Sequence, residues 1–217
     1  MVDVGKRECG IVGVKFDSEN HIYTVDGKVV PSVTQILDLL SYEEFGKIDK
    51  STLDYASKRG TAIHEATELL DMGLEAEIDA ETEPYVKAYM DFTRDYKPTW
   101  LGIEEMVYHP EFEFCGTIDR LGKIGNKFIV MDIKTVSSPD RLTYTKVCMQ
   151  TFMYSLCLED KYETYALFLK KDGTYRLFNC HEWWLKNREH GEFGTCVSLI
   201  KAYKTIKEIK NERKFIY

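Results

Sequence analysis

Apolar positions between residues 112 and 136 predict two β-strands, residues 112–123 and 127–135, joined by a tight turn. Gly125 and Asn126 separate the strands, and a two-residue loop that begins with glycine is typical of a type II′ hairpin turn. Apolar side chains occur at both alternating sets of positions in residues 127–135, which indicates that both faces of this strand are covered. We therefore expect this hairpin to supply the central strand of a larger sheet.

This hairpin places two acidic residues opposite each other. With the glycine and asparagine as the loop, Asp119 lies directly across from Asp132, and Lys134 projects from the same face of the sheet. Facing carboxylates repel each other and are costly to bury, which indicates that a divalent metal ion compensates them. The alternative is a salt bridge between Lys134 and one of the acids, which would leave the other acid unpaired.

Other periodic segments predict helices and strands on both sides of this hairpin. The order α–β–β–β–α–β defines an α/β core, with a central mixed sheet flanked by helices. The predicted helices cover residues 51–72, 82–97, 141–158 and the C-terminal segment, and the other predicted strands cover residues 101–109, 164–171 and 174–180.

The chain of 217 residues, 44% of them hydrophobic, is long enough for one well-packed domain. We expect a single domain over residues 1–217 with three parts: an N-terminal hairpin and short helix (10–40), the core (51–180) and a C-terminal helical extension (181–217).

Further polar residues are candidates for the same site. His64 and Glu68 are four residues apart, so they share one side of the first long helix. An imidazole would add a nitrogen ligand to an oxygen-rich metal site, although a lone helical histidine is usually a surface or core residue. In the strand over residues 101–109, Glu104 or Glu105 points toward the aspartates, and the pleat that decides between them is left open.

Two more pairs of polar residues admit a structural and a functional interpretation. Ser32 or Thr34 is placed to cap the short helix after the N-terminal hairpin, and the same hydroxyl and N–H groups would suit a phosphate. Gln150 and Tyr154 are also four residues apart on a helix, an arrangement that by itself usually marks a solvated surface.

Charge and cysteine content exclude several classes of protein. Lys and Arg number 29 against 36 Asp and Glu, and the net charge of −7 weighs against non-specific coating of nucleic acid. The six cysteines show neither a CxxC motif nor clustered spacing, so we expect no zinc site, no iron–sulfur cluster and a reduced, cytoplasmic chain. No segment approaches the roughly 18 apolar residues that span a bilayer, and the N-terminal residues do not resemble a signal peptide.

Four short motifs together resemble those of one nuclease family. Gly116-Thr-Ile-Asp119 followed by Asp132-Ile-Lys134 resembles the PD-(D/E)XK nuclease signature in its G-x-x-D … D-x-K form. Residues 59–64 (RGTAIH) and 150–154 (QTFMY) resemble the RGT-x-x-H and Q-x-x-x-Y motifs of the RecB-like exonuclease branch. Residues 26–37 look like the lead-in of phage-type exonucleases and of the mitochondrial genome maintenance exonuclease, so the resemblance covers roughly residues 22–170. Many relatives carry Glu where Asp132 stands, which shortens the ligand arm here.

The resemblance implies a restriction-endonuclease-like core with a metal site. It implies that Asp119, Asp132, His64 and the backbone carbonyl of Ile133 bind the metal, and that Lys134 assists the attacking water. Oxygen ligands with few soft partners favour Mg²⁺ or Mn²⁺, as one or two ions, over zinc. Carboxylates beside an ammonium group favour its charged form, so positioning the water suits Lys134 better than acting as a general base.

The resemblance also gives Gln150 and Tyr154 a part in ordering the site or the DNA. Glu68, Glu104 and Glu105 remain secondary candidates. The candidate DNA contacts are Ser32, Thr34, Arg59 and Thr135.

These observations predict a metal-dependent DNA exonuclease that hydrolyses phosphodiester bonds from single-stranded or frayed ends. Its basic groove would include Lys58, Arg59 and the C-terminal lysines, separate from the acidic residues. The alternatives are a flap or junction endonuclease on the same fold and a non-catalytic nucleic-acid-binding module. The phage-type resemblance is consistent with a phage-encoded enzyme that acts in the cytoplasm of a bacterial host. Polarity, preference for DNA over RNA, processivity, oligomeric state and protein partners are left open.

Overall fold

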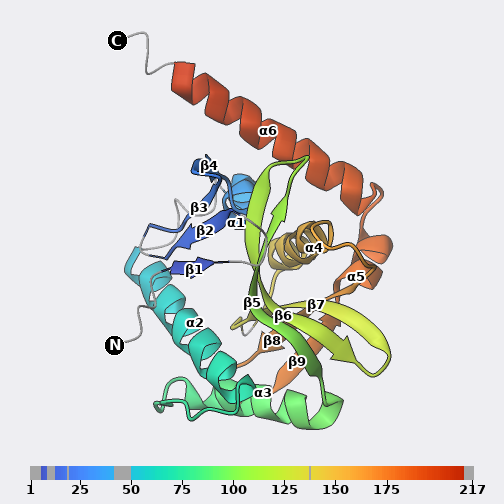
Figure 1. Ribbon diagram of the computed structural model, residues 1–217. Helices are drawn as coiled ribbons and strands as arrows, with labels where there is room; N and C mark the ends of the chain where they lie inside the picture. Colours follow the sequence, from blue (N-terminus) through green and yellow to red (C-terminus); the bar gives the residue numbers. More distant parts are fainter. Residues whose placement is uncertain (1–5, 9–12, 19, 42–49, 137, 213–217) are drawn as a thin grey trace.

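The computed structural model describes residues 6–8, 13–18, 20–41, 50–136 and 138–212. Residues 10–12 of the predicted N-terminal hairpin and residues 213–217 of the predicted C-terminal extension lie outside the described residues. The described chain forms a five-stranded sheet with helices on both faces, and a four-stranded sheet packs against one end of its long strands (Figure 1).

The predicted hairpin lies in the middle of the five-stranded sheet. The turn has the expected geometry, because Gly125 adopts a φ of +59° and Ile124 pairs with Lys127 across it. Strands β7 and β8 run parallel, and the other neighbouring strands of this sheet run antiparallel. The strands lie in sequence order: β5 (Thr99–His109), β6 (Phe114–Ile124), β7 (Lys127–Lys134), β8 (Glu163–Leu169) and β9 (Tyr175–Asn179).

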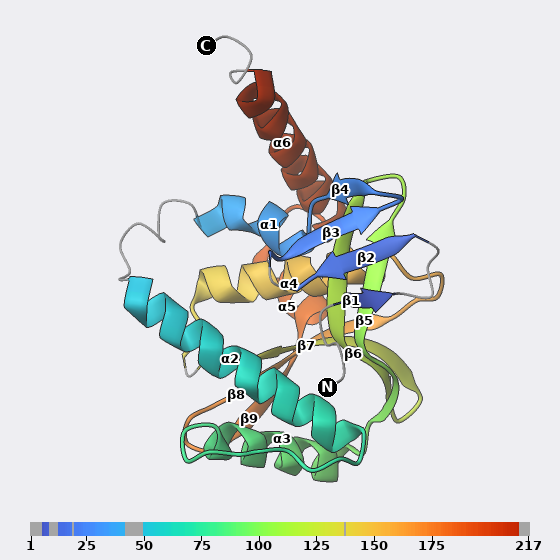
Figure 2. The ribbon, with the colours of Figure 1, turned by 60° about the vertical axis from the view of Figure 1, so that its left-hand side comes forward.

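One face of the sheet is covered by α2 (Lys50–Asp71) and α3 (Glu83–Tyr96). Ile129, Met131 and Ile133 of β7 are fully buried here among the aromatic side chains of α3. Burial of each such side chain stabilises the fold by about 1.5–3 kcal/mol. Figure 2 shows α2 in front of the sheet, with its C-terminal end against α3.

The opposite face of the sheet is covered by α4 (Arg141–Ser155), with α5 (Cys180–Asn187) and α6 (Glu192–Glu212) beyond it. Val130 of β7 belongs to the hydrophobic cluster on this side, which also includes Trp184 of α5. The central strand is therefore apolar on both faces, as predicted. The mixed sheet, the flanking helices and the order αβββαβ confirm the predicted α/β class.

The N-terminal region contains more strand than the predicted hairpin. Its four antiparallel strands are β1 (Lys6–Glu8), β2 (Val14–Asp17), β3 (Ile22–Val25) and β4 (Lys28–Val30). The predicted hairpin over residues 10–30 is therefore part of a small four-stranded sheet. Its buried side chains Val14, Tyr23 and Val30 pack against Met106 of β5 and Cys115 of β6, so this sheet supports the start of the central hairpin.

A short helix, α1 (Val33–Leu37), follows this sheet and continues as a 3₁₀ turn, η1 (Asp38–Ser41). The hydroxyl of Ser32 accepts a hydrogen bond of 3.1 Å from the N–H of Gln35, and the Gln35 side chain accepts one of 3.2 Å from the N–H of Ser32. This reciprocal capping box accounts for Ser32, which is 2% exposed. Thr34 is exposed and does not cap the helix.

The C-terminal helix α6 packs only along its first half. Tyr203 is buried, but Ile206 and Ile209 are 37% and 46% exposed, so the apolar face of this helix is covered only as far as Tyr203. Figure 1 shows the second half of α6 projecting away from the sheets. No helix in the described part of the chain is long and apolar enough to cross a membrane.

A glycine in β6 permits the close approach of α4. A Cβ atom at Gly116 would lie 2.3 Å from Cε1 of the buried Tyr154 ring, whereas a Cβ at Gly60 of α2 would meet only Thr135 Oγ1, at 3.8 Å. We expect Gly116→Ala to lower the free energy of unfolding by about 1–3 kcal/mol through overpacking. Gly60→Ala is the matched control and should raise it by up to about 1 kcal/mol, because alanine favours helix. Urea unfolding followed by circular dichroism measures both, and equal stability of Gly116→Ala and the wild type would contradict the packing argument.

Candidate metal centre

The candidate site forms where β6 and β7 separate. Their pairing ends at Arg120 and Met131, whereas β6 continues beside β5 and β7 continues beside β8. Asp119 is the next residue of β6, and its Oδ2 accepts a hydrogen bond of 2.6 Å from the N–H of Ile133. The carboxylate therefore lies in the fork between the strands, one position beyond their last pair, where the register also places Asp132.

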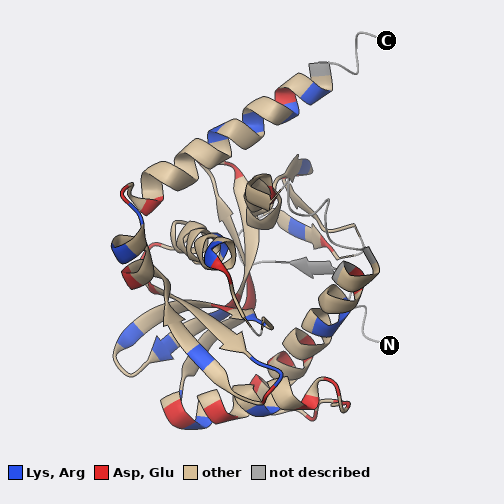
Figure 3. Ribbon diagram, turned by 180° about the vertical axis from the view of Figure 1, so that it is seen from behind, with Lys and Arg blue, Asp and Glu red and all other residues tan. Residues whose placement is uncertain are grey.

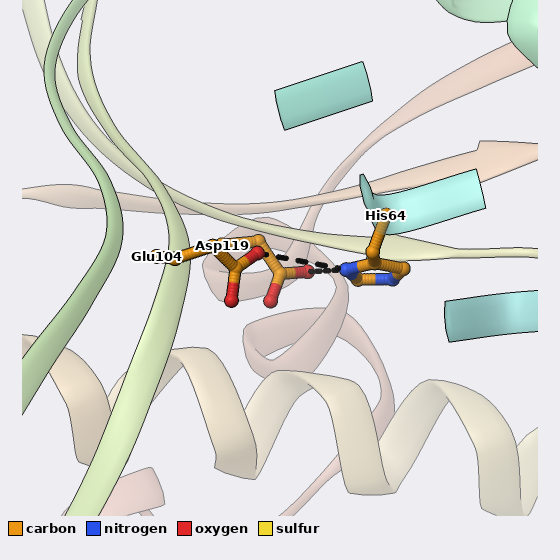
Figure 4. A group of neighbouring side chains, drawn as sticks. All are labelled: His64, Glu104 and Asp119. Atoms are coloured by element: carbon orange, nitrogen blue, oxygen red, sulfur yellow. Dashed lines mark ion pairs between the residues drawn. The ribbon is translucent and has the colours of Figure 1, made fainter. Parts of the chain in front are cut away.

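Three side chains converge at this fork, each from a different element. His64 of α2, Glu104 of β5 and Asp119 of β6 each offer a ligand atom, and these atoms lie within 4.8 Å of one another. His64 Nδ1 is 3.6 Å from Asp119 Oδ2 and 3.8 Å from Glu104 Oε1. Figure 4 shows both carboxylates directed toward the imidazole. The three residues are separated in sequence, so only the fold brings them together.

The backbone of β5 decides which of two adjacent glutamates enters the site. Glu104 has a φ of +51°, in the left-handed region that non-glycine residues rarely adopt, and its carboxylate turns toward Asp119 and His64. Glu105 is exposed, and its carboxylate lies beside Gly102 instead. The structure thus assigns Glu104 to the cluster and corrects the candidacy of Glu105. Such a conformation costs about 1–3 kcal/mol, and strain of this kind is found at functional sites.

Asp132 and Lys134 form an ion pair at the edge of the cluster. Lys134 Nζ is 2.8 Å from Asp132 Oδ2, and Asp132 lies outside the set of ligand atoms that are within 4.8 Å of one another. Burial raises the pKa of Asp132 to about 6, although Lys134 opposes the shift. Burial lowers the pKa of Lys134, but Asp132 and Asp119 outweigh this effect and raise it. Lys134 is therefore held in its charged form.

The imidazole of His64 is fixed at both nitrogens. Nε2 lies 3.1 Å from the carbonyl oxygen of Ile133, so this nitrogen carries the proton that it donates, and Nδ1 faces the two carboxylates. Burial lowers the pKa of His64, but Asp119 and Glu104 outweigh it and raise the pKa to about 9. The Ile133 carbonyl, a predicted metal ligand, is engaged by this hydrogen bond, and its role as a ligand stays a prediction.

Gln150 and Tyr154 are buried beneath the site. Gln150 Nε2 donates a hydrogen bond of 2.9 Å to the hydroxyl of Tyr154. The two side chains are 9% and 3% exposed, so the interpretation as solvated surface is wrong. Burial and the neighbouring Asp132 raise the pKa of Tyr154 well above its ordinary value, which keeps this hydroxyl protonated.

The remaining candidates lie around the cluster. Glu68, one turn beyond His64 on α2, is outside the three-residue group. Thr135 follows β7, and its Oγ1 would lie 3.8 Å from a Cβ atom at Gly60 of α2. Arg59 is partly buried, with its guanidinium over the rings of Tyr55 and Tyr85. DNA binding by Ser32, Thr34, Arg59 and Thr135 remains a prediction.

Sequence analysis missed one charged residue next to the site. Arg120 follows Asp119 directly and is fully buried, where it pairs with Asp71 at 2.6 Å. The available signal was an arginine within a strand of the predicted central hairpin, because a buried guanidinium requires a buried acid. The partner could not be identified from the sequence, because Asp71 lies 49 positions away at the end of α2.

The donor set suits a hard divalent cation. Glu104 Oε1 is buried without a hydrogen-bond partner, and a buried carboxylate oxygen of this kind calls for a cation. Two carboxylates and one imidazole form an oxygen-rich donor set without a thiolate, and the choice of Mg²⁺ or Mn²⁺ stays a prediction. His64, Glu104 and Asp119 are the residues placed to hold such an ion, with Asp132 beside them.

No family model matches this sequence, and a search of curated proteins found no match. Among solved structures, the chain is similar to the alkaline exonuclease LHK-Exo from Laribacter hongkongensis, with 14% identity and a TM-score of 0.39 over 86% of this chain and 94% of that chain. A second structure, LHK-Exo in complex with dAMP, matches with the same identity and TM-score over 87% and 95% of the two chains. A likeness of this degree assigns neither a family nor an activity to the chain.

The raised pKa of His64 predicts a pH-dependent stability in metal-free protein. The folded state holds this proton more tightly than the unfolded chain, whose imidazole has the ordinary value of 6.5. The stabilisation is therefore complete below pH 6.5 and is lost as the pH rises to about 9. We expect a loss of up to about 3 kcal/mol over this window.

Urea unfolding in EDTA at several pH values measures this effect, with His64→Gln as the comparison. The difference in unfolding free energy between wild type and His64→Gln should shrink as the pH rises through this window. A difference that is constant with pH would show that His64 does not carry the shift.

Proposed function

We propose that the chain is a metal-dependent nuclease that hydrolyses phosphodiester bonds in DNA. The observation that carries this proposal is the convergence of His64, Glu104 and Asp119 at the fork of two strands, with the Asp132–Lys134 pair beside them. A purely structural site would have little reason to gather the carboxylates of Glu104 and Asp119 in one place with a third carboxylate, Asp132, nearby, because like charges repel. Such a site suits phosphodiester hydrolysis, because a cation held there would neutralise the negative charge that builds up on the phosphoryl oxygens.

In this mechanism the side chains hold and orient the reactants. Asp119 is fixed by the N–H of Ile133, and the imidazole of His64 is fixed by the carbonyl of the same residue, so both point into the fork. Lys134, charged and paired with Asp132, is placed to orient the attacking water and the scissile phosphate. A bound divalent cation would supply charge neutralisation and lower the pKa of a coordinated water.

Gln150 and Tyr154 support this arrangement from α4. Their mutual hydrogen bond orients the two side chains on α4, and the close approach of the tyrosine ring to Gly116 packs α4 against β6. The hydroxyl accepts the hydrogen bond from Gln150 and stays neutral, because its pKa is raised well above the ordinary value. We assign these two residues to the ordering of the site rather than to the chemical step.

The distribution of charge is compatible with a DNA substrate despite the net charge of −7. Figure 3 shows acidic positions on α3 and on the loop that precedes it, whereas α6 carries mainly basic positions. Lys204 of α6 pairs with Glu113 at 3.1 Å, at the turn between β5 and β6. Arg59 and Lys58 belong to a different helix, α2, and a basic groove that they share with the lysines of α6 stays a prediction.

The finer proposal is an exonuclease that acts on single-stranded or frayed ends. Its support is the order of the four motifs, which resembles that of RecB-like exonucleases. An endonuclease at flaps or junctions is the competing activity on this fold, and a non-catalytic DNA-binding module is the competing class.

The adjacent glutamates of β5 provide a matched test of the site. Glu104→Gln should lower DNA hydrolysis by more than the roughly 10–100-fold typical of an outer-shell partner, because it removes a proposed metal ligand. Glu105→Gln removes the same charge one residue away, outside the cluster, and should retain wild-type activity. Steady-state cleavage of a labelled oligonucleotide in Mg²⁺ and in Mn²⁺ measures both. Equal losses in the two variants would reject the assignment of Glu104.

A comparison of linear and circular single-stranded DNA tests the requirement for an end. The wild type should release mononucleotides or short products from an end-labelled linear strand and leave a covalently closed circle intact. Asp132→Ala and Lys134→Ala should both abolish product formation, while binding of the oligonucleotide persists.

The alternatives give different results in the same assay. Cleavage of the circle would support the endonuclease, and binding without metal-dependent cleavage by the wild type would support the non-catalytic module. Activity that survives both alanine substitutions would reject the proposed site.

A further inference from the structure

One fully buried arginine connects the candidate site to the helices behind it. Arg120 is 0% exposed and is the largest side chain in the described chain with less than 2% exposure. Burying a guanidinium is costly unless each of its donors is paired, so its contacts reveal what the fold uses it for. These contacts extend in two directions, toward helices α2 and α3 and toward the group formed by His64, Glu104 and Asp119.

On the side of the helices, the guanidinium is held by three residues. Arg120 Nε donates to Asp71 Oδ2 at 2.6 Å and lies 3.2 Å from the hydroxyl of Tyr89, which itself donates to Asp71 at 2.5 Å. Arg120 Nη2 donates to Thr67 Oγ1 at 3.0 Å. Asp71 balances the charge, and the three partners fix the plane of the guanidinium.

On the side of the cluster, the remaining nitrogen contacts the two strands that carry acidic ligands. Arg120 Nη1 donates to the backbone carbonyl of Asp119 at 2.7 Å and lies 3.7 Å from Glu104 Oε1. This glutamate oxygen is the one that is buried without a hydrogen-bond partner. Glu104 Oε1 therefore has two positive groups nearby, the guanidinium of Arg120 at 3.7 Å and the imidazole of His64 at 3.8 Å.

We propose that Arg120 is a positioning residue, which sets the placement of Glu104 and Asp119 for cation binding. This inference rests on the proposed function, because it concerns the same site. The positive charge of the guanidinium stabilises the Glu104 carboxylate and so offsets the cost of the left-handed backbone at this residue. The hydrogen bond from Arg120 to the Asp119 carbonyl fixes β6 at the fork. Its distance of 3.7 Å from Glu104 leaves that oxygen free to coordinate a cation.

Lysine cannot replace this function, although it retains the charge. The planar guanidinium bonds Asp71, Thr67 and the Asp119 carbonyl with different nitrogens at the same time, whereas an ammonium group is a point charge on a flexible stem. In Arg120→Lys the link between the helices and the strand carbonyl would be broken, and Glu104 would lose its fixed neighbour.

The experiment measures Mn²⁺ affinity directly, by calorimetry and by the electron paramagnetic resonance spectrum of Mn²⁺, in the full chain without DNA. Arg120→Lys should weaken Mn²⁺ binding by about 10–100-fold, as expected for a residue that supports a ligand. Glu105→Gln is the matched control, because it removes a carboxylate one residue from Glu104 that lies outside the cluster. It should leave Mn²⁺ affinity within about twofold of wild type.

A second variant covers the possibility that Arg120→Lys does not fold. Asp71→Asn keeps an oxygen beside Arg120 but removes the balancing charge, so the guanidinium should pair more closely with Glu104 and weaken Mn²⁺ binding severalfold. Unchanged Mn²⁺ affinity in a folded Arg120→Lys, or in Asp71→Asn, would show that the arginine only holds the helices in place, and would overturn the inference.

The outcomes separate this inference from the proposed function. Mn²⁺ binding that is lost in Glu104→Gln and weakened in Arg120→Lys, with no DNA hydrolysis by wild type, would overturn the nuclease and support the positioning role. Absence of Mn²⁺ binding in the wild type would overturn both.

Discussion

The hydrogen bond from the N–H of Ile133 to the carboxylate of Asp119 is the interaction on which the site depends. Two strands that pair tightly from the hairpin turn must separate before either can present polar groups to a ligand, and separation leaves backbone donors and acceptors unpaired. Asp119 satisfies the donor and His64 satisfies the acceptor of the same residue. Asp119 and His64 thus replace the missing strand pairing at Ile133. The same two side chains are also candidate metal ligands, so they have a structural role and a proposed chemical role at once.

Around this interaction, the charges are arranged in opposed pairs. Three buried or partly buried carboxylates, Glu104, Asp119 and Asp132, face Lys134, the imidazole of His64 and the guanidinium of Arg120. Without a cation, the imidazole holds a proton and supplies the missing positive charge. With a cation bound, the imidazole would give up that proton, so proton release and metal binding are coupled. In this site a bound cation would therefore replace the proton of His64 as the source of positive charge.

Much of this arrangement opposes stability. A left-handed glutamate, a carboxylate with a raised pKa and a buried arginine each cost free energy, and the apolar packing of β7 against helices on both faces offsets it. Such concentrations of strain and buried charge are expected at functional sites and are rare elsewhere in a fold. The supporting sheet, by contrast, follows ordinary rules of turn geometry and alternation.

The sequence alone determined the hairpin register, the burial of the central strand on both faces and the order of the core elements. Glycine-first turns and period-two patterns act locally, so they can be recognised without the fold. The same local rules placed Asp119 near Asp132 and His64 on its helix. Tertiary structure decided the rest. The choice of Glu104 over Glu105 depends on one left-handed residue, and the burial of Gln150 and Tyr154 depends on a glycine in a strand far away in sequence. The pairing of Arg120 with Asp71 joins a strand to the end of a helix, a contact with no local signature. The sequence pattern of one helix or strand indicates which of its faces is apolar. Only the packed tertiary structure determines which faces of different elements come into contact.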